Sequence, residues 1–255
     1  MTPVARLHHT VEGAGPPVVL LHGLGSCAAD WAEQLPALRP RHRTLCVDLP
    51  GHGASPPADG PLTVESMAGE LAALLTAEAP AHVVGLSLGA CVALRLALQA
   101  PARVRTLTLV NPFARLRPRG PGDVARMLTR LTLLGVAPMT TLAAHVARRL
   151  FPRPEQRALY EAAVARLAGT PRGAYAAALR ALARFDARGQ LGAIRRPTLV
   201  VAGDRDTTVP LEAKVAVADA IAGARLVVVP GSGHATPHDQ PAAFNRLLVN
   251  FLAAN

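Results

Sequence analysis

Short apolar runs alternate with helical patterns along the chain, and the two patterns predict different elements. Six mainly apolar runs are bounded by glycine, proline or polar turn residues, at 18–21, 44–47, 82–86, 106–110, 198–202 and 226–229. Such runs are typical of strands that are buried on both faces, as in a parallel sheet. Residues 4–11 predict one more strand, at the edge of that sheet.

Segments with helical patterns lie between these runs, at 28–38, 64–78, 88–100, 211–222 and 239–253. Thr63 is the expected N-cap of the second segment, and Pro101 ends the third. A regular alternation of strands and helices implies right-handed crossover connections. The predicted fold class is therefore α/β, with a mostly parallel, doubly wound sheet whose functional loops leave the carboxyl ends of the strands.

The alternation is interrupted after Asn111. Residues 113–190 contain no clear strand and predict four helices, at 123–134, 139–151, 154–168 and 172–185, with prolines between them. The strand pattern resumes at Pro197. An insertion between two strands of one sheet is expected to cover the strand ends. The predicted domains are therefore a core of residues 1–112 and 191–255 and a helical cap of residues 113–190.

Composition excludes several classes of protein. Of the 255 residues, 50% are hydrophobic and 17% are charged, which is typical of a globular chain. No run of about 18 uncharged apolar residues predicts a membrane span, and the first residues lack the pattern of a secretory signal. The three cysteines (Cys27, Cys46 and Cys91) form neither a disulfide framework nor a metal-ligand spacing, so we expect reduced thiols in a cytoplasmic protein.

The net charge of +10 is confined to one segment. Residues 113–190 hold fourteen arginines and four acidic residues, and the rest of the chain is neutral. The chain has only eight Phe, Tyr and Trp residues in all, which leaves little surface on which bases can stack. We therefore expect no nucleic-acid partner. The arginines either form solvated helix faces or hold an anionic group of a substrate, because guanidinium binds carboxylate bidentately.

The strongest chemical signal is the motif G-x-S-x-G at residues 85–89. It follows a predicted strand and opens a predicted helix, which is the setting of a nucleophile elbow. In that turn Ser87 projects its hydroxyl above the edge of the sheet. A serine hydroxyl becomes a good nucleophile only when a base removes its proton. The sequence therefore predicts Ser87 as the nucleophile of a hydrolase.

Two later loops supply candidates for the base and its carboxylate. His234 follows the last strand within a glycine-rich loop, and His238, four residues further on, is the alternative base. A carboxylate is needed to fix the tautomer of the histidine and stabilise the imidazolium. Asp206 is the preferred partner, and Asp204 is the alternative, since an aspartate this close to a strand end often caps a turn. Along the chain, the predicted nucleophile, acid and base follow in the order Ser87, Asp206, His234.

Backbone amides complete the predicted site. The N–H of Leu88, directly after the nucleophile, and the N–H of Leu24, in the loop after the first central strand, are the expected donors of an oxyanion hole. The segment G-L-G at 23–25 is not a dinucleotide motif, because Ala28 takes the place of the third glycine. No phosphate loop of the G-K-[ST] type is present either. We expect neither a cofactor nor a bound metal.

These features together resemble the α/β-hydrolase superfamily, in the branch with a helical cap. The resemblance covers nearly the whole chain and is carried by five motifs, at 22–25, 48–55, 85–89, 203–210 and 233–234. The family pattern G-x-x-D-x-x-x-P matches residues 203–210 and also points to Asp206. In that family the loop at 48–55 is structural. Relatives with an aspartate nucleophile, such as haloalkane dehalogenases, are excluded by Ser87.

The resemblance implies a serine hydrolase that acts on small to medium carboxylic esters through an acyl-enzyme. The expected partner is a small-molecule ester, with the protein either a monomer or a homo-oligomer. The alternatives are a lactone or C–C bond hydrolase acting on a carboxylated substrate, similar to the 3-oxoadipate enol-lactonases, and a perhydrolase or haloperoxidase. A ligand sensor without catalysis is also possible on this fold, but no feature of the sequence favours it.

Overall fold

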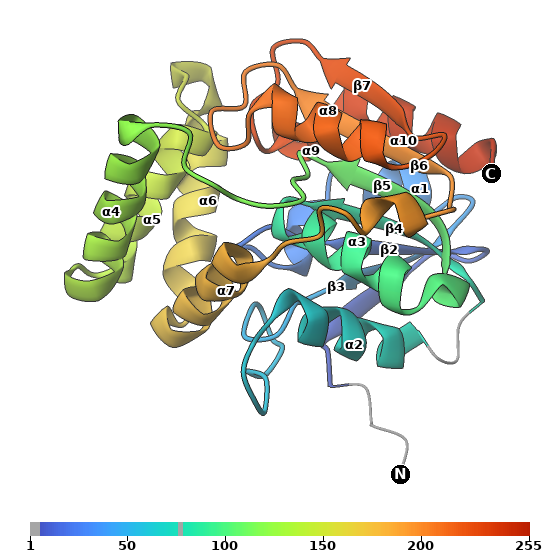
Figure 1. Ribbon diagram of the computed structural model, residues 1–255, viewed down its shortest axis with the longest axis horizontal. Helices are drawn as coiled ribbons and strands as arrows, with labels where there is room; N and C mark the ends of the chain where they lie inside the picture. Colours follow the sequence, from blue (N-terminus) through green and yellow to red (C-terminus); the bar gives the residue numbers. More distant parts are fainter. Residues whose placement is uncertain (1–5, 76–78) are drawn as a thin grey trace.

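A seven-stranded sheet forms the centre of the molecule (Figure 1). The computed structural model describes residues 6–75 and 79–255. The strand order is β1-β3-β2-β4-β5-β6-β7, and every pair of neighbours is parallel except β1 and β3. The strands are β1 (His9–Glu12), β2 (Pro17–Leu21), β3 (Arg43–Val47), β4 (Ala81–Leu86), β5 (Val104–Val110), β6 (Thr198–Gly203) and β7 (Arg225–Val229). The predicted fold class is confirmed.

All six apolar runs form strands, and helices bury the central ones on both faces of the sheet, whereas β7, at the edge, is only partly buried. The predicted edge strand is β1, which begins at His9 rather than at residue 4 and runs antiparallel to β3. Residues 4 and 5 of that prediction lie outside the described residues. β1 is mostly exposed, so its sequence lacks the strong apolar signal of the central strands.

Helices cover both faces of the sheet, and the sheet separates the hydrophobic core into two clusters, one on each face. On one face lie α2 (Val64–Leu74), α3 (Leu88–Gln99) and α8 (Leu211–Ala220). On the other lie the 3₁₀ helix η1 (Ala28–Trp31), α1 (Leu35–Leu38) and α10 (Pro241–Ala253). Thr63 caps α2 as predicted, by accepting a 3.0 Å hydrogen bond from the backbone N–H of Ser66. The Ser66 hydroxyl in turn accepts one from the Thr63 N–H, which completes a capping box.

Two segments predicted as single helices are each divided in two, and prolines explain both divisions. Residues 28–38 form η1 and the single turn α1 instead of one helix, because Pro36 has no N–H to continue a helix from the preceding turn. Residues 239–253 were predicted as one helix, but α9 (Thr236–Asp239) ends before Pro241, which begins α10. The helix predicted at 64–78 ends at Leu74, and residues 76–78 lie outside the described residues.

Four α-helices are inserted between β5 and β6 and gather at one side of the sheet (Figure 1). They are α4 (Pro121–Val136), α5 (Met139–Leu150), α6 (Arg157–Gly169) and α7 (Arg172–Arg184). They share a small core of their own, made of Leu134, Leu142, Ala143, Leu167 and Tyr175. The two ends of the insertion meet, since the N–H of Ala187 donates to the carbonyl of Ala114 at 2.9 Å.

The insertion packs tightly against the loop after β2. Gly25 has a φ of 76°, a backbone conformation that favours glycine. A Cβ atom at this position would lie 2.9 Å from Cγ of Leu167 and 3.0 Å from Cε2 of Tyr175. α4 carries an apolar stripe, defined here as four residues whose side chains remain exposed: Val124, Met127, Leu128 and Leu131.

Within residues 6–75 and 79–255, every helix is too short or too polar to traverse a lipid bilayer.

Candidate active site

Ser87 lies in the sharp turn between β4 and α3. Its φ of 54° and ψ of −107° are unusual for a residue with a side chain. The turn is held by a 3.0 Å hydrogen bond from the N–H of Ser87 to the carbonyl of Val110 on β5. The Ser87 side chain forms no capping bond to α3. The strained turn therefore leaves the hydroxyl available at the carboxyl end of the central strand.

The glycines of the motif allow α3 to approach the sheet closely. A Cβ atom on Gly89 would collide with the Leu21 carbonyl oxygen and lie 2.8 Å from the His22 carbonyl oxygen. A Cβ atom on Gly85 would collide with the carbonyl of Gly89 itself. Backbone atoms cannot move aside as a flexible side chain can. Both glycines are therefore required for the position of Ser87.

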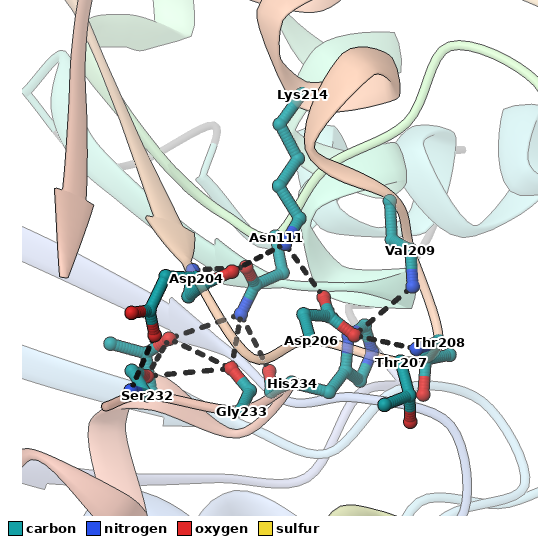
Figure 2. A network of polar contacts seen from close by, with 12 residues as sticks. Asn111, Asp204, Asp206, Thr207, Thr208, Val209, Lys214, Ser232, Gly233 and His234 are labelled. Carbon is teal, nitrogen blue, oxygen red and sulfur yellow. Dashed lines mark hydrogen bonds and ion pairs between the residues drawn. The ribbon is translucent and has the colours of Figure 1, made fainter. Parts of the chain in front are cut away.

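The loops after β6 and β7 bring Asp206 and His234 together (Figure 2). The Nδ1 atom of His234 lies 2.8 Å from Oδ2 of Asp206. The other carboxylate oxygen, Oδ1, accepts hydrogen bonds from the backbone N–H groups of Thr208 (2.7 Å) and Val209 (3.0 Å). The side chains of His234 and Asp206 are 9% and 1% exposed. The carboxylate is thus fixed in the orientation that favours a proton on Nδ1 and leaves Nε2 free to accept one.

The two alternatives from the sequence occupy other positions. Asp204 accepts a 3.1 Å hydrogen bond from the backbone N–H of Ser232 and shapes the β7 loop. His238 is largely enclosed on α9, with Nε2 3.9 Å from Asp30, and desolvation lowers the pKa of its imidazole. Neither side chain forms a hydrogen bond or an ion pair with His234 or Asp206.

Burial alone would raise the pKa of Asp206, because it disfavours the charged form. The charge and hydrogen bond of His234, and then those of Lys214, outweigh burial and hold the pKa of this carboxyl well below its usual range. Asp206 is therefore ionised whenever the protein is folded at ordinary pH.

Lys214 on α8 is a polar partner that the sequence prediction missed. Its Nζ atom lies 2.9 Å from Oδ2 of Asp206 and donates to the carbonyl of Gly203 at 3.1 Å. Burial lowers the pKa of the Lys214 ammonium, and the charge of Asp206 offsets part of that effect. One signal in the sequence marks this residue, since Lys214 is the only lysine in the chain.

Asn111, the first residue after β5, was also missed as a site residue. Its side chain is buried and joins three loops at the carboxyl edge of the sheet (Figure 2). Nδ2 donates to the carbonyl of His234 at 2.7 Å and to Oγ1 of Thr236 at 3.1 Å, and Oδ1 accepts from the N–H of Gly203 at 2.9 Å. Asn111 thereby holds the backbone of the histidine loop.

The two predicted oxyanion donors lie in the loops after β2 and β4. Leu88 is the first residue of α3, where backbone N–H groups have no partner within the helix. Leu24 lies in a turn in which the N–H of Ser26 donates to the carbonyl of Gly23 at 3.3 Å. Among the described residues, neither leucine N–H donates a hydrogen bond to another protein group.

His22 supports the loop that contains Leu24. Its Nδ1 lies 2.7 Å from the carbonyl of Gly23, and its Nε2 accepts from the N–H of Leu49 at 3.0 Å. Burial lowers the pKa of His22 to about 3, so the ring is neutral and can make both bonds. Asp48 has a similar structural function in the neighbouring loop, where it accepts from the N–H groups of Ala28 and Ala54.

No group of three or more His, Cys, Asp and Glu side chains in the described part of the chain is arranged to hold a metal ion.

A model of the alpha/beta hydrolase fold family matches residues 16–241. A protein named carbamate hydrolase RutD from Azorhizobium caulinodans is 33% identical over 97% of this chain and 95% of its own. The pimeloyl-[acyl-carrier protein] methyl ester esterase of Methylococcus capsulatus is 38% identical over 79% of this chain and 80% of its own.

Solved structures agree with these relatives. The enol-lactonase from Burkholderia xenovorans superposes with a TM-score of 0.89 at 29% identity, over 97% of this chain and 96% of that chain. A hydrolase from Pseudomonas aeruginosa superposes with a TM-score of 0.87 at 35% identity, over 96% and 94% of the two chains. The chain therefore belongs to the alpha/beta hydrolase fold family and is a hydrolase.

Proposed function

We propose that this hydrolase cleaves small to medium carboxylic esters with Ser87 as nucleophile, His234 as general base and Asp206 as the carboxylate that orients it. The observation that carries the proposal is the 2.8 Å contact between His234 and Asp206, in loops that leave the same sheet edge as the Ser87 turn. A base needs an orienting partner, and a nucleophile needs a base.

The reaction proceeds in two halves. Nε2 of His234 takes the proton of Ser87 while Oγ attacks the ester carbonyl, and the N–H groups of Leu24 and Leu88 stabilise the oxyanion. The tetrahedral intermediate collapses, and the protonated His234 gives its proton to the leaving alcohol. A water molecule, deprotonated by His234, then attacks the acyl-enzyme. Collapse of the second intermediate releases the acid and returns the proton to Ser87.

The helical insertion is proposed to act as the cap that selects the substrate. Leu167 and Tyr175 of the insertion pack on the Gly25 loop, next to the proposed oxyanion donor Leu24. Both side chains are buried in the core of the insertion, so this contact fixes the position of the insertion relative to that loop. The names of the relatives include an ester hydrolase and a carbamate hydrolase, and hydrolysis of either substrate breaks a single bond between a carbonyl carbon and a heteroatom.

A second candidate, hydrolysis of a carboxylated lactone, is favoured by one observation. Arg149 on α5 donates to the carbonyl of Thr207, the residue after Asp206, at 3.1 Å. Together with Ala144, His145 and Arg148 it lines a hollow in the surface. An arginine in this position is suited to hold a carboxylate close to the site. The similarity to an enol-lactonase structure agrees with this candidate.

The decisive experiment measures the release of p-nitrophenol from acyl esters of two to twelve carbons. We expect Ser87→Ala to reduce kcat by about four to six orders of magnitude while the fold is retained. Ser66→Ala, the same substitution at the start of α2, is the control and should hydrolyse the esters as the wild type does. A fluorophosphonate should add one adduct to the wild type and none to Ser87→Ala.

An inactive wild type with a native circular dichroism spectrum would exclude the esterase proposal. Carboxylated lactones would then be tested with the wild type and with Arg149→Met. The second candidate predicts a higher KM for the variant with carboxylated lactones, and an unchanged KM with their methyl esters.

A further inference from the structure

Lys214 and His234 bind the same oxygen atom of Asp206. Nζ of Lys214 lies 2.9 Å from Oδ2, and Nδ1 of His234 lies 2.8 Å from it, while Oδ1 is occupied by two backbone N–H groups (Figure 2). A carboxylate that serves one histidine does not require a second cation on the same oxygen. Orientation of His234 alone therefore does not explain why the Lys214 ammonium also binds Oδ2 of Asp206.

The burial of Lys214 shows that this contact is specific. Its side chain is 0% exposed, whereas lysine is almost never fully buried unless it is paired. Its partners are Asp206 and the carbonyl of Gly203. The chain has 26 arginines and this single lysine. A guanidinium would place five donors in a site with two acceptors, whereas an ammonium presents a compact charge on a flexible stem.

Other charged groups face the pair from several elements. Asp204 and Glu212 act on Lys214 from the β6 loop and the first turn of α8. Arg149 faces Asp206 from α5. Glu212 is 83% exposed, so solvent screens it, whereas Lys214 and Asp206 are enclosed. Lys214 is therefore the cation with the strongest effect on the charge that Asp206 presents to His234.

We propose that Lys214 is a positioning residue that sets the basicity of His234: its cation shares one oxygen of Asp206 with the imidazole and reduces the negative charge that the imidazole experiences. An imidazolium next to a partly neutralised carboxylate is less stable, so His234 remains a neutral base at lower pH than Asp206 alone would allow. This inference rests on the proposed function of His234.

The test compares the pH profiles of kcat/KM for the wild type, Lys214→Gln and Lys214→Met. Gln keeps two donors without the charge, and Met removes both. Since the two nitrogens bond one oxygen, they are less than about 6 Å apart, and an effective dielectric of about 20 gives a shift of roughly two pH units. We expect the acidic limb to move to higher pH by that amount in both variants.

Arg205→Gln is the matched control, because it removes the same charge from an exposed residue next to Asp206. Its acidic limb should stay within about 0.3 pH units of the wild type, as expected for a screened charge. A role in packing alone would lower kcat in the Lys214 variants and leave their acidic limb in place. That result would overturn the proposal.

A second measurement does not depend on catalysis. In protein labelled with ¹³C-histidine, the resonance of His234 is identified by its loss in His234→Asn and titrated in the wild type and in Lys214→Gln. We expect the midpoint to move to higher pH in the variant by the same shift of roughly two pH units. This outcome in a protein without esterase activity would refute the proposed function and retain the electrostatic inference. An unmoved midpoint would refute the inference alone.

The wild type provides a test if neither variant folds. A ¹³C-lysine label gives a single side-chain resonance, because the chain contains one lysine. We expect Lys214 to remain protonated throughout the His234 titration and its Cε resonance to show a step at the same midpoint. A lysine that is neutral in this range, or one without the step, would overturn the proposal.

Discussion

Replacement of Asn111 by alanine tests whether one side chain holds the histidine loop. Asn111 lies at the end of β5 and is completely buried. Its amide group is the only connection described above that joins the loops after β5, β6 and β7 at a single point. Its φ is 48°, a conformation that asparagine adopts more readily than alanine.

The loss of unfolding free energy in Asn111→Ala is calculated from the groups that lose a hydrogen-bond partner. Alanine at position 111 leaves the N–H of Gly203 and the carbonyl of His234 without the bonds of 2.9 and 2.7 Å that they now have. Each buried group without a partner costs about 1 to 3 kcal/mol. The left-handed backbone of alanine adds about 1 kcal/mol. We therefore expect the free energy of unfolding to fall by about 3 to 7 kcal/mol, a large part of the roughly 5–15 kcal/mol typical of a domain.

The assay is urea unfolding followed by circular dichroism, combined with kcat/KM on p-nitrophenyl acetate. Asn245→Ala is the control, because the side chain of Asn245 donates one 2.8 Å bond to the carbonyl of Glu33 at the surface. The free energy of unfolding of the control should fall by no more than about 1 kcal/mol, and its activity should be unchanged. If the free energy of unfolding of Asn111→Ala lies within about 1 kcal/mol of the wild-type value and the variant keeps full activity, the histidine loop does not depend on this side chain.

Three further predictions follow from the site and its supports. Gly89→Ala should destabilise the protein by more than about 3 kcal/mol in urea unfolding, because the new Cβ collides with backbone of β2; a loss below about 1 kcal/mol would contradict this. Asp206→Asn should reduce kcat about 10²- to 10⁴-fold and Asp204→Asn less than about tenfold, and equal losses in ester hydrolysis would refute the assignment of the carboxylate. Stability should fall as pH decreases from about 6.5 to about 4, because burial lowers the pKa of His22 to about 3 and that of His82 to about 4, so that the unfolded chain binds more protons in this range. For each histidine, the free energy of unfolding should fall by about 1.4 kcal/mol per pH unit within this range. Urea midpoints that are equal at pH 7, 6 and 5 would contradict this prediction.

The sheet could be predicted from the sequence because its central strands are buried on both faces. That burial requires continuous apolar runs such as Val18–Leu21, which have few other interpretations. Ser87, Asp206 and His234 were found for a related reason, since each follows such a run within a glycine-rich or turn motif. The contact of His234 with Asp206 agrees with that choice, and their catalytic roles stay predictions.

Lys214 and Asn111 were not predicted, because their importance depends on distant partners. Asn111 bonds to a residue 123 positions away, and no local pattern in the sequence encodes such a contact. Lys214 lies in a helix whose pattern gives no reason to bury a charge. The exposed stripe of α4 was also not foreseen, since an apolar face predicts burial in general but does not identify what covers it.

The contact between Gly25 and the inserted helices limits how this enzyme can be modified or can diverge. Leu167 and Tyr175 touch the same loop that contains the proposed oxyanion donor Leu24. The insertion is therefore not an exchangeable module: a chimera that takes residues 113–190 from a relative would also need that relative's loop around position 25. A substitution at Leu167 would also disturb the loop that contains this proposed donor, so changes in the insertion are expected to alter the rate of hydrolysis as well.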